Sequence, residues 1–504
     1  MKYTRRRFVQ GMGVTAGSTL LPASAFAQNL AGNELQIPAL DSGQARDGGQ
    51  HYSLQLQTGT RQFLSGLTTN TLGIDGDFLG PTLRFKNGDD INLSVLNQLA
   101  EQSTIHWHGL HVPAKADGGP AQIIEPASTW QPSFTVAQKA GTFWYHSHLL
   151  NKTGDQVYRG LAGMIIIDDE ESEKLELPST YGVDDIPLIV QDRRFNEDGS
   201  FRYVGMHRDV MTGVFGDRVL VNGTPQAAFT PTTEKVRFRI LNAANARTFN
   251  FALADGREFS LIASDGGFLE RPITQRNLVL APAERAEIVV DFSDGNAVDL
   301  ISLPIEASSP FSPIGMMRNM HPMNTESFTI LAIEPQSTLQ STAALPSQLT
   351  SIRRMQISEA SRTRSFELSM PMGMGMMGRG GQRGGGGMGG MGGQFLINGR
   401  PMAMDEINEV VPVNSTEIWE IHNDSMMMHP FHIHHGQFQI LDRDGVPPGP
   451  EEMGFKDTVK IGPGQTARFI MRFENFSDPD TAYMYHCHIL EHEDNGMMGQ
   501  FTVA

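Results

Sequence analysis

The chain has 504 residues, a formal net charge of −17 and a single cysteine. This length suffices for roughly two to four domains with cores of their own. The acidic charge argues against nucleic acid or an anionic membrane surface as a partner, and one cysteine cannot form an intrachain disulfide.

The N-terminal residues have the pattern of an export signal. Residues 4–13 read TRRRFVQGMG, and a run of apolar and small residues then leads to Ala25-Phe26-Ala27. Twin arginines, a short apolar segment and an A-x-A end predict a signal peptide of the twin-arginine (Tat) pathway over residues 1–27. No later run approaches the roughly 20 apolar residues of a membrane span. We therefore expect a monomer that is exported, to the periplasm or otherwise out of the cytoplasm, without a membrane span.

Short β-branched or alternating segments dominate the chain from about residue 50 onward. Residues 83–97, 286–292 and 466–473, for example, read LRFKNGDDINLSVLN, AEIVVDF and TARFIMRF. Gly, Pro, Asn and Asp separate these segments, and long helical periodicity is missing. The pattern predicts an all-β protein built from sandwiches.

A loose internal repeat indicates three related domains. The repeat begins with an aliphatic residue, an Asp or Asn, and a Gly, and it leads to a strand that ends at an Asn. The three copies begin at residues 74–76, 221–223 and 397–399, and their strands end at Asn97, Asn242 and Asn423, respectively. We predict domains at 45–170, 171–340 and 397–504, with a connecting segment over 341–396. Residues 370–393 of that segment read MPMGMGMMGRGGQRGGGGMGGMGG. Glycine at this density predicts a flexible insertion that belongs to no core.

Four histidine-rich segments point to metal chemistry. They read His106-Trp107-His108, His146-Ser147-His148, His429-Pro430-Phe431-His432-Ile433-His434 and His486-Cys487-His488. On a strand, residues i−1 and i+1 share one face and residue i takes the other. His486 and His488 can therefore reach one metal site, and Cys487 a second. A single H-x-H pair would more often be coincidental, whereas four such segments predict a metal centre between the first and third domains, with the middle domain as a spacer.

The stretch around Cys487 has the donors of an electron-transfer site. His492 and Met497 follow the cysteine at offsets of five and ten. A thiolate, imidazoles and a weak axial thioether make a blue-copper site. The stretch around Cys487 lacks one imidazole of this set, which must come from upstream in the chain.

In this order, the four segments resemble the copper-binding signatures of the multicopper oxidase family, across nearly the whole predicted mature chain. The resemblance implies three cupredoxin domains in tandem and four copper ions. Its ligand sets, carried over by position, are His429, Cys487, His492 and axial Met497 for type 1 copper; His106 and His432 for type 2; His108, His146 and His488 for one type 3 copper; and His148, His434 and His486 for the other. No ligand is missing, which excludes family members that kept the fold and lost their copper. Asp117 and Glu493 match acids that the family places near the three-copper cluster for proton delivery.

The family's chemistry couples one-electron oxidation of a reductant to four-electron reduction of dioxygen to water. The methionine-rich insertion resembles that of bacterial copper-efflux oxidases, which oxidise Cu(I) to Cu(II), because soft thioethers select Cu(I). Met370 and Met427 match positions of that branch's substrate-copper site. The acids that usually complete it are absent, since Ser425 stands four residues before His429 and the insertion holds no carboxylate.

The leading prediction is therefore an exported cuprous oxidase that confers copper tolerance. Two alternatives stay open: a laccase that oxidises phenols or aromatic amines, and a copper-binding sink or carrier without turnover. A second methionine group, Met316, Met317, Met320 and Met323, is either part of the Cu(I) route or gap-filling core.

Overall fold

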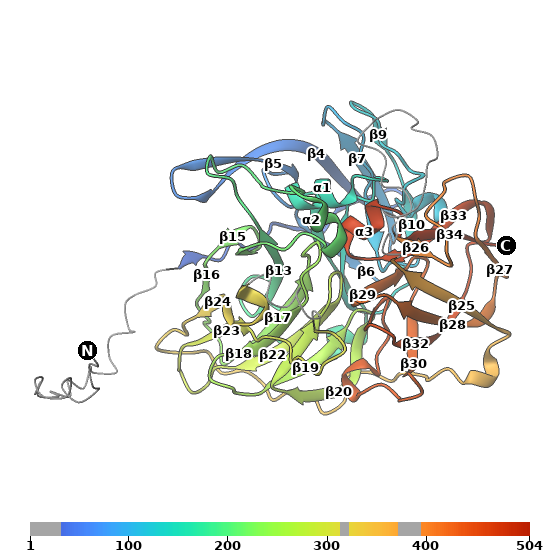
Figure 1. The fold of residues 1–504 in the computed structure, drawn as a ribbon. Coiled ribbons are helices and arrows are strands. Elements are labelled where there is room, and N and C mark those ends of the chain that lie inside the picture. Colours follow the sequence, from blue (N-terminus) through green and yellow to red (C-terminus); the bar gives the residue numbers. More distant parts are fainter. Residues whose placement is uncertain (1–31, 313–321, 371–394) are drawn as a thin grey trace, which may run out of the picture. The chain divides into compact units, whose positions relative to one another are not determined.

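Strands make up most of the regular structure of the chain. The computed structural model describes residues 32–312, 322–370 and 395–504, which contain three short α-helices, α1 (Thr153–Arg159), α2 (His207–Thr212) and α3 (Leu490–Asp494) (Figure 1). Short 3-10 helices are η1 (Ala114–Ala116), η2 (Ser172–Lys174), η4 (Pro322–Asn324), η5 (Ile357–Glu359) and η6 (Pro450–Glu452). The prediction of an all-β fold is confirmed. Within the described residues, no helix has the length and apolar character needed to cross a membrane.

Three predictions concern residues outside the described ranges. They are the signal peptide over 1–27, the group formed by Met316, Met317 and Met320, and the glycine-rich insertion after Met370.

The first pair of sheets comes from the N-terminal third of the chain. One sheet has the order β10-β7-β4-β3, with β5 on β4 and β9 on β7, and the other has the order β2-β6-β12-β11-β8. The strands are β2 (Leu40–Asp41), β3 (Gln44–Arg46), β4 (Gly49–Leu64), β5 (Leu67–Ile74), β6 (Thr82–Lys86), β7 (Asp90–Asn97), β8 (His106–His108), β9 (Thr129–Trp130), β10 (Ser133–Thr135), β11 (Gly141–His146) and β12 (Ala162–Asp168). Ile91, Leu93 and Val95 alternate along β7 and are buried in the shared core, as the two-residue period of a strand requires.

The middle pair of sheets is built mainly from residues 185–333. Its sheets have the orders β15-β14-β13-β17-β22-β19-β20 and β1-β16-β24-β23-β18-β21. The strands are β1 (Asn33–Glu34), β13 (Asp185–Arg193), β14 (Arg218–Val221), β15 (Thr224–Pro225), β16 (Ala227–Phe229), β17 (Lys235–Asn242), β18 (Phe249–Leu253), β19 (Phe259–Ser264), β20 (Gly267–Gln275), β21 (Asn277–Leu280), β22 (Arg285–Asp291), β23 (Val298–Ser302) and β24 (Phe328–Ile333). β1 lies outside every predicted domain, yet it pairs in parallel with β16.

The last pair of sheets has the orders β26-β25-β28-β32-β30 and β27-β34-β33-β29-β31. The strands are β25 (Arg362–Ser369), β26 (Leu396–Ile397), β27 (Glu409–Val411), β28 (Ser415–Asp424), β29 (His429–Ile433), β30 (Phe438–Arg443), β31 (Thr458–Ile461), β32 (Thr466–Phe473), β33 (Asp478–Cys487) and β34 (Met498–Val503). Cys487, at the end of β33, is fully buried in the core of this pair together with Met497.

The internal repeat is visible in equivalent hydrogen bonds. Asp75, Asn222 and Asn398 have φ values of 53°, 51° and 52°. Each one exchanges two hydrogen bonds with the backbone of a single residue on a neighbouring strand, namely Gln55, Ile189 and Glu367. Asn97, Asn242 and Asn423 are fully buried, and each side-chain amide donates to two backbone carbonyls. The three sheet pairs are thus constructed alike, while the boundaries at 45–170, 171–340 and 397–504 stay predictions.

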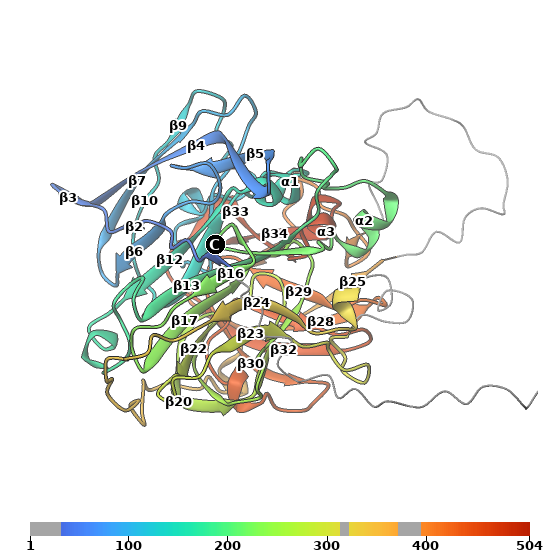
Figure 2. The ribbon, with the colours of Figure 1, turned by 90° about the vertical axis from the view of Figure 1, so that its left-hand side faces the viewer.

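The three α-helices, one beside each sheet pair, lie together. α3 contacts both α1 and α2, and the two ribbon views agree (Figures 1 and 2). Asp494 of α3 accepts hydrogen bonds from the backbone of Thr153 and Gly154, and Glu491 accepts one from the backbone of Val214. This junction fixes the segment that follows Cys487.

Candidate metal centre

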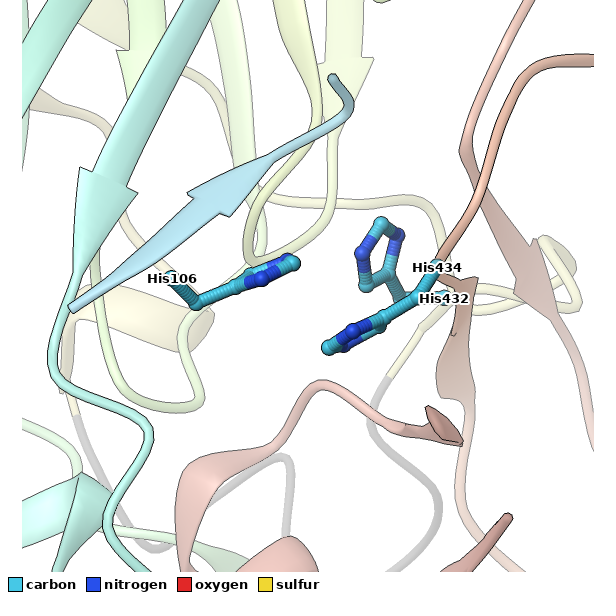
Figure 3. Close-up of side chains that lie close together, drawn as sticks. All are labelled: His106, His432 and His434. Carbon is cyan, nitrogen blue, oxygen red and sulfur yellow. The ribbon is translucent and has the colours of Figure 1, made fainter. Parts of the chain in front are cut away.

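Strand pairing brings the four histidine-rich segments together. β8 pairs antiparallel with β11, which sets His106 opposite His146, and β29 pairs with β33, which sets His432 opposite His486. Figure 3 shows the ring of His106 directed toward those of His432 and His434, which come from the last sheet pair. The centre therefore lies between the first and last sheet pairs.

Among the described residues, four buried groups made only of histidine and cysteine side chains have donor atoms within 4.8 Å of one another. The groups are His106, His432 and His434; His108, His146 and His488; His148, His434 and His486; and His429, Cys487 and His492. Every histidine that the sequence predicts as a ligand occurs in one of these groups.

The cysteine group is compact. His429 Nδ1 lies 3.2 Å from Cys487 Sγ and 3.3 Å from His492 Nδ1, and Cys487 Sγ lies 3.8 Å from His492 Nδ1. Met497 is fully buried beside them, and its carbonyl accepts the backbone N–H of Cys487. Burial raises the pKa of the Cys487 thiol, so a bound cation is what would hold it as a thiolate.

The histidine groups place their nitrogens face to face. His486 Nε2 lies 3.2 Å from His148 Nε2 and 3.4 Å from His434 Nε2, and His108 Nδ1 lies 3.4 Å from His146 Nε2. His106 Nε2, His432 Nε2 and both ring nitrogens of His488 are buried without a hydrogen-bond partner among the described residues. Converging ring nitrogens without hydrogen-bond partners indicate a ligand-binding site, because a buried polar atom without a partner costs free energy.

Burial favours the neutral form of eight of these imidazoles. It lowers the pKa of His148 to about 4 and that of His429 to about 3. The pKa values of six others also fall well below the ordinary value, chiefly through burial: His108, His146, His432, His434, His488 and His492. Neutral imidazole is the form that binds metal.

Comparison with known proteins identifies the family. Models described as multicopper oxidase match residues 55–172, 168–299 and 381–504. "Multicopper oxidase mco" of Staphylococcus aureus is 36% identical over 477 residues, which cover 94% of this chain and 93% of that protein. The chain belongs to the multicopper oxidase family. It is accordingly an oxidase that uses copper and dioxygen.

Other relatives of this multicopper oxidase carry different descriptions. A structure described as a laccase-like multi-copper oxidase, CueO from Ochrobactrum sp. with activity towards lignin model compounds and lignosulfonate, superimposes with a TM-score of 0.81 at 33% identity, covering 93% of this chain and 100% of that one. "Cell division protein FtsP" of Escherichia coli is 33% identical over 512 residues, covering 100% of this chain and 99% of that protein. Membership in the multicopper oxidase family therefore does not by itself name the reductant.

The donor sets fit the copper that a multicopper oxidase uses. Imidazole and thiolate are ligands that copper favours. All four groups are buried, and the histidine groups contain ring nitrogens without a hydrogen-bond partner among the described residues.

Two carboxylates contact the histidine groups of this multicopper oxidase. Asp117 Oδ2 lies 2.7 Å from His434 Nδ1, and its backbone carbonyl accepts from His106 Nδ1 at 2.9 Å. Glu493 Oε2 lies 3.1 Å from His486 Nδ1, and its Oε1 lies 3.4 Å from His148 Nδ1. Burial opposes ionisation of Glu493, but the adjacent imidazoles prevail and lower its pKa to about 2. Carboxylates that take up Nδ1–H leave Nε2 free to face the centre.

Met370 and Met427 are half-buried against the core of the last sheet pair. Met427 lines a cavity of about 290 Å³ with Met323, Met428 and Ile489, whose backbone N–H donates to Cys487 Sγ. Ser425 Oγ lies 2.8 Å from His429 Nε2. The residue that stands in for the expected acid thus contacts a ligand of the cysteine group.

Sequence reasoning missed Asp457. Its Oδ1 lies 3.2 Å from His108 Nε2, and with His108 and His432 it forms a further group of potential donors. Nothing in the surrounding Lys456-Asp457-Thr458 distinguishes this acid from an ordinary loop carboxylate. His111 and His435 contact each other through Nδ1 atoms 3.0 Å apart and belong to none of these groups.

Proposed function

We propose that this multicopper oxidase is an exported, monomeric cuprous oxidase that transfers electrons from Cu(I) to dioxygen for copper tolerance. The type 1 copper is assigned to His429, Cys487 and His492 with axial Met497. The type 2 copper is assigned to His106 and His432, and the type 3 pair to His108, His146 and His488 and to His148, His434 and His486.

One observation carries the oxidase assignment. Cys487 ends β33 between His486 and His488, which belong to two different histidine groups. About two residues of covalent chain therefore join the cysteine group to the centre where dioxygen would be reduced. A storage protein needs no such link, which disfavours the copper sink or carrier. Four bound copper ions would supply one electron each, the number that reduction of dioxygen to water requires.

The chain's own residues prepare this chemistry. The histidine groups are buried, which excludes bulk water from them. Asp117 accepts from His434 Nδ1, and the Glu493 carboxylate faces the Nδ1 atoms of His486 and His148, so both acids favour the Nδ1–H tautomers. We assign proton delivery to the same two carboxylates, because both lie against imidazoles of the centre where oxygen would be reduced.

Soft donors support Cu(I) as the reductant. Met323, Met427 and Met428 line the cavity beside the cysteine group, and thioethers select Cu(I) over harder ions. Six further methionines between residues 371 and 393 would add donors of the same kind.

A second candidate, oxidation of phenols, is favoured by the same cavity. Phe215, Leu303 and Ile489 contribute apolar walls, and a volume of about 290 Å³ approaches the lower end of small-molecule sites.

Oxygen uptake decides between these reductants. We expect copper-loaded protein to consume dioxygen with Cu(I) faster than with a phenol. Deletion of residues 371–393 is expected to lower the ratio of Cu(I) to phenol oxidation at least about tenfold, the effect of about 1.4 kcal/mol of lost Cu(I) binding. An unchanged ratio would show that this segment does not set specificity, and no uptake with either reductant would refute the oxidase assignment.

The axial role of Met497 predicts a change in potential. Met497→Leu removes a weak thioether ligand that stabilises the oxidised ion, so the reduction potential of the type 1 copper should rise. We expect a shift of at least about 60 mV, equivalent to a tenfold change in a one-electron equilibrium. A redox titration followed by visible absorption measures it, with Met471→Leu in the same core as the matched control. Equal potentials in the two variants would remove Met497 from the ligand set.

A further inference from the structure

A buried arginine from the middle sheet pair reaches the metal centre. Arg285 begins β22, in a sheet that contributes no predicted copper ligand, and its side chain is inaccessible to solvent. Its Nη1 donates to Asp457 Oδ1 at 2.7 Å, and its Nη2 donates to Asp457 Oδ2 at 2.6 Å. This is the bidentate geometry in which an arginine fixes the plane of a carboxylate.

Asp457 in turn contacts two imidazoles. Its Oδ1 faces His108 Nε2 at 3.2 Å, and its backbone carbonyl accepts from His432 Nδ1 at 2.8 Å. The opposite nitrogens, His108 Nδ1 and His432 Nε2, are the ones directed at the centre, since the first lies 3.4 Å from His146 Nε2 and the second has no hydrogen-bond partner among the described residues. One residue therefore orients ligands of two different proposed copper positions.

The surroundings hold Arg285 in a single arrangement. Its Nε donates to the carbonyl of Thr142 at 3.0 Å, and its Nη2 also donates to the carbonyl of Asp265 at 2.9 Å. A Cβ at Gly109 would lie 2.4 Å from Asp457 Oδ2 and 3.0 Å from Arg285 Nη2. The glycine that follows His106-Trp107-His108 thus makes room for this ion pair.

We propose that Arg285 is a positioning residue for the histidine centre, acting through Asp457 on His108 and His432. The middle sheet pair is then more than a spacer, because it sets the orientation of ligands on both of the other sheet pairs. The inference rests on the proposed type 2 and type 3 ligand sets.

The test compares Arg285→Lys with Arg239→Lys in the full copper-loaded chain. Lysine keeps the charge but cannot form the bidentate pair. Arg239 is the matched control because it is equally buried in the same sheet and pairs with Asp185, which contacts no proposed ligand. For Arg285→Lys we expect about 10–100-fold weaker retention of type 2 and type 3 copper in chelator competition and an altered type 2 electron paramagnetic resonance spectrum. The type 1 visible absorption should stay unchanged, since neither Arg285 nor Asp457 contacts its ligands.

Asp457→Asn is the second variant, nearly isosteric, and serves if Arg285→Lys does not fold. It changes the side chain that faces His108 and keeps the backbone carbonyl that accepts from His432. It should therefore weaken retention of the type 3 copper held by His108, with the type 1 absorption retained. A wild-type spectrum and wild-type copper retention in either folded variant would overturn the inference, as would an equal loss in Arg239→Lys. Absence of type 2 copper from the wild-type chain would instead refute the proposed ligand sets, so the two failures are distinguishable.

Discussion

Cys487→Ser is expected to abolish the blue-copper absorption and to lower oxygen uptake at least about a thousandfold, which corresponds to about 4 kcal/mol of lost transition-state stabilisation. The thiolate is the donor that gives this site its colour and its electron-transfer properties, and a serine hydroxyl at the same position does not ionise to replace it. Cys487 is also the residue that joins the cysteine group to His486 and His488. Visible absorption and an oxygen electrode measure the two losses, with Cu(I) and a phenol as separate reductants.

Metal analysis distinguishes this effect from misfolding. The histidine groups do not use Cys487, so Cys487→Ser should retain about three of about four copper ions, together with the type 2 resonance. Loss of all copper would mean that the substitution disrupts the fold. Retention of rapid oxygen uptake would show that electrons reach the histidine groups by another route, and the proposed function would then be wrong.

The sequence alone predicted the features that repeat every two residues along a strand. Alternation along β7 and the H-x-H spacing both follow from the two-residue period of a strand. The repeated Asp or Asn before Gly at 75, 222 and 398 was also informative, because these positions adopt positive φ, a conformation in which Asn and Asp are enriched. Patterns of this kind are local, so they survive without knowledge of the tertiary contacts.

Contacts between distant segments could not be predicted in the same way. Asp457 is 172 residues from Arg285 and 349 residues from His108 in the sequence. In the sequence, Asp457 and Arg285 resemble ordinary charged residues, and nothing links them to His108. The pairing of β1 with β16 depends likewise on packing that no local pattern encodes. The position of Arg285 could not be predicted because the middle domain has no histidine pair, and a residue that orients metal ligands through a carboxylate needs none.

Glu493→Gln is expected to slow oxygen reduction at least about a hundredfold, within the range for loss of a positioned proton-transfer group. Its carboxylate faces His486 Nδ1 at 3.1 Å and His148 Nδ1 at 3.4 Å. A glutamine amide can accept from one of these N–H groups but presents a donor to the other, so one imidazole loses the partner that fixes its tautomer. Single-turnover reoxidation of fully reduced protein by dioxygen isolates this step from oxidation of the reductant.

Glu491→Gln provides the matched control for Glu493→Gln. Glu491 lies on the same helix and is equally buried, but its carboxylate accepts from Asn245 Nδ2 and the backbone of Val214 and not from a ligand imidazole. We expect its reoxidation rate to stay within about threefold of the wild type, the equivalent of well under 1 kcal/mol. Equal slowing in both variants would point to a disturbed α3, and no slowing in Glu493→Gln would leave Asp117 as the acid to be tested. Because reduction of the type 1 copper needs no proton from Glu493, the rate at which Cu(I) bleaches the blue absorption should be the same in Glu493→Gln and in the wild type.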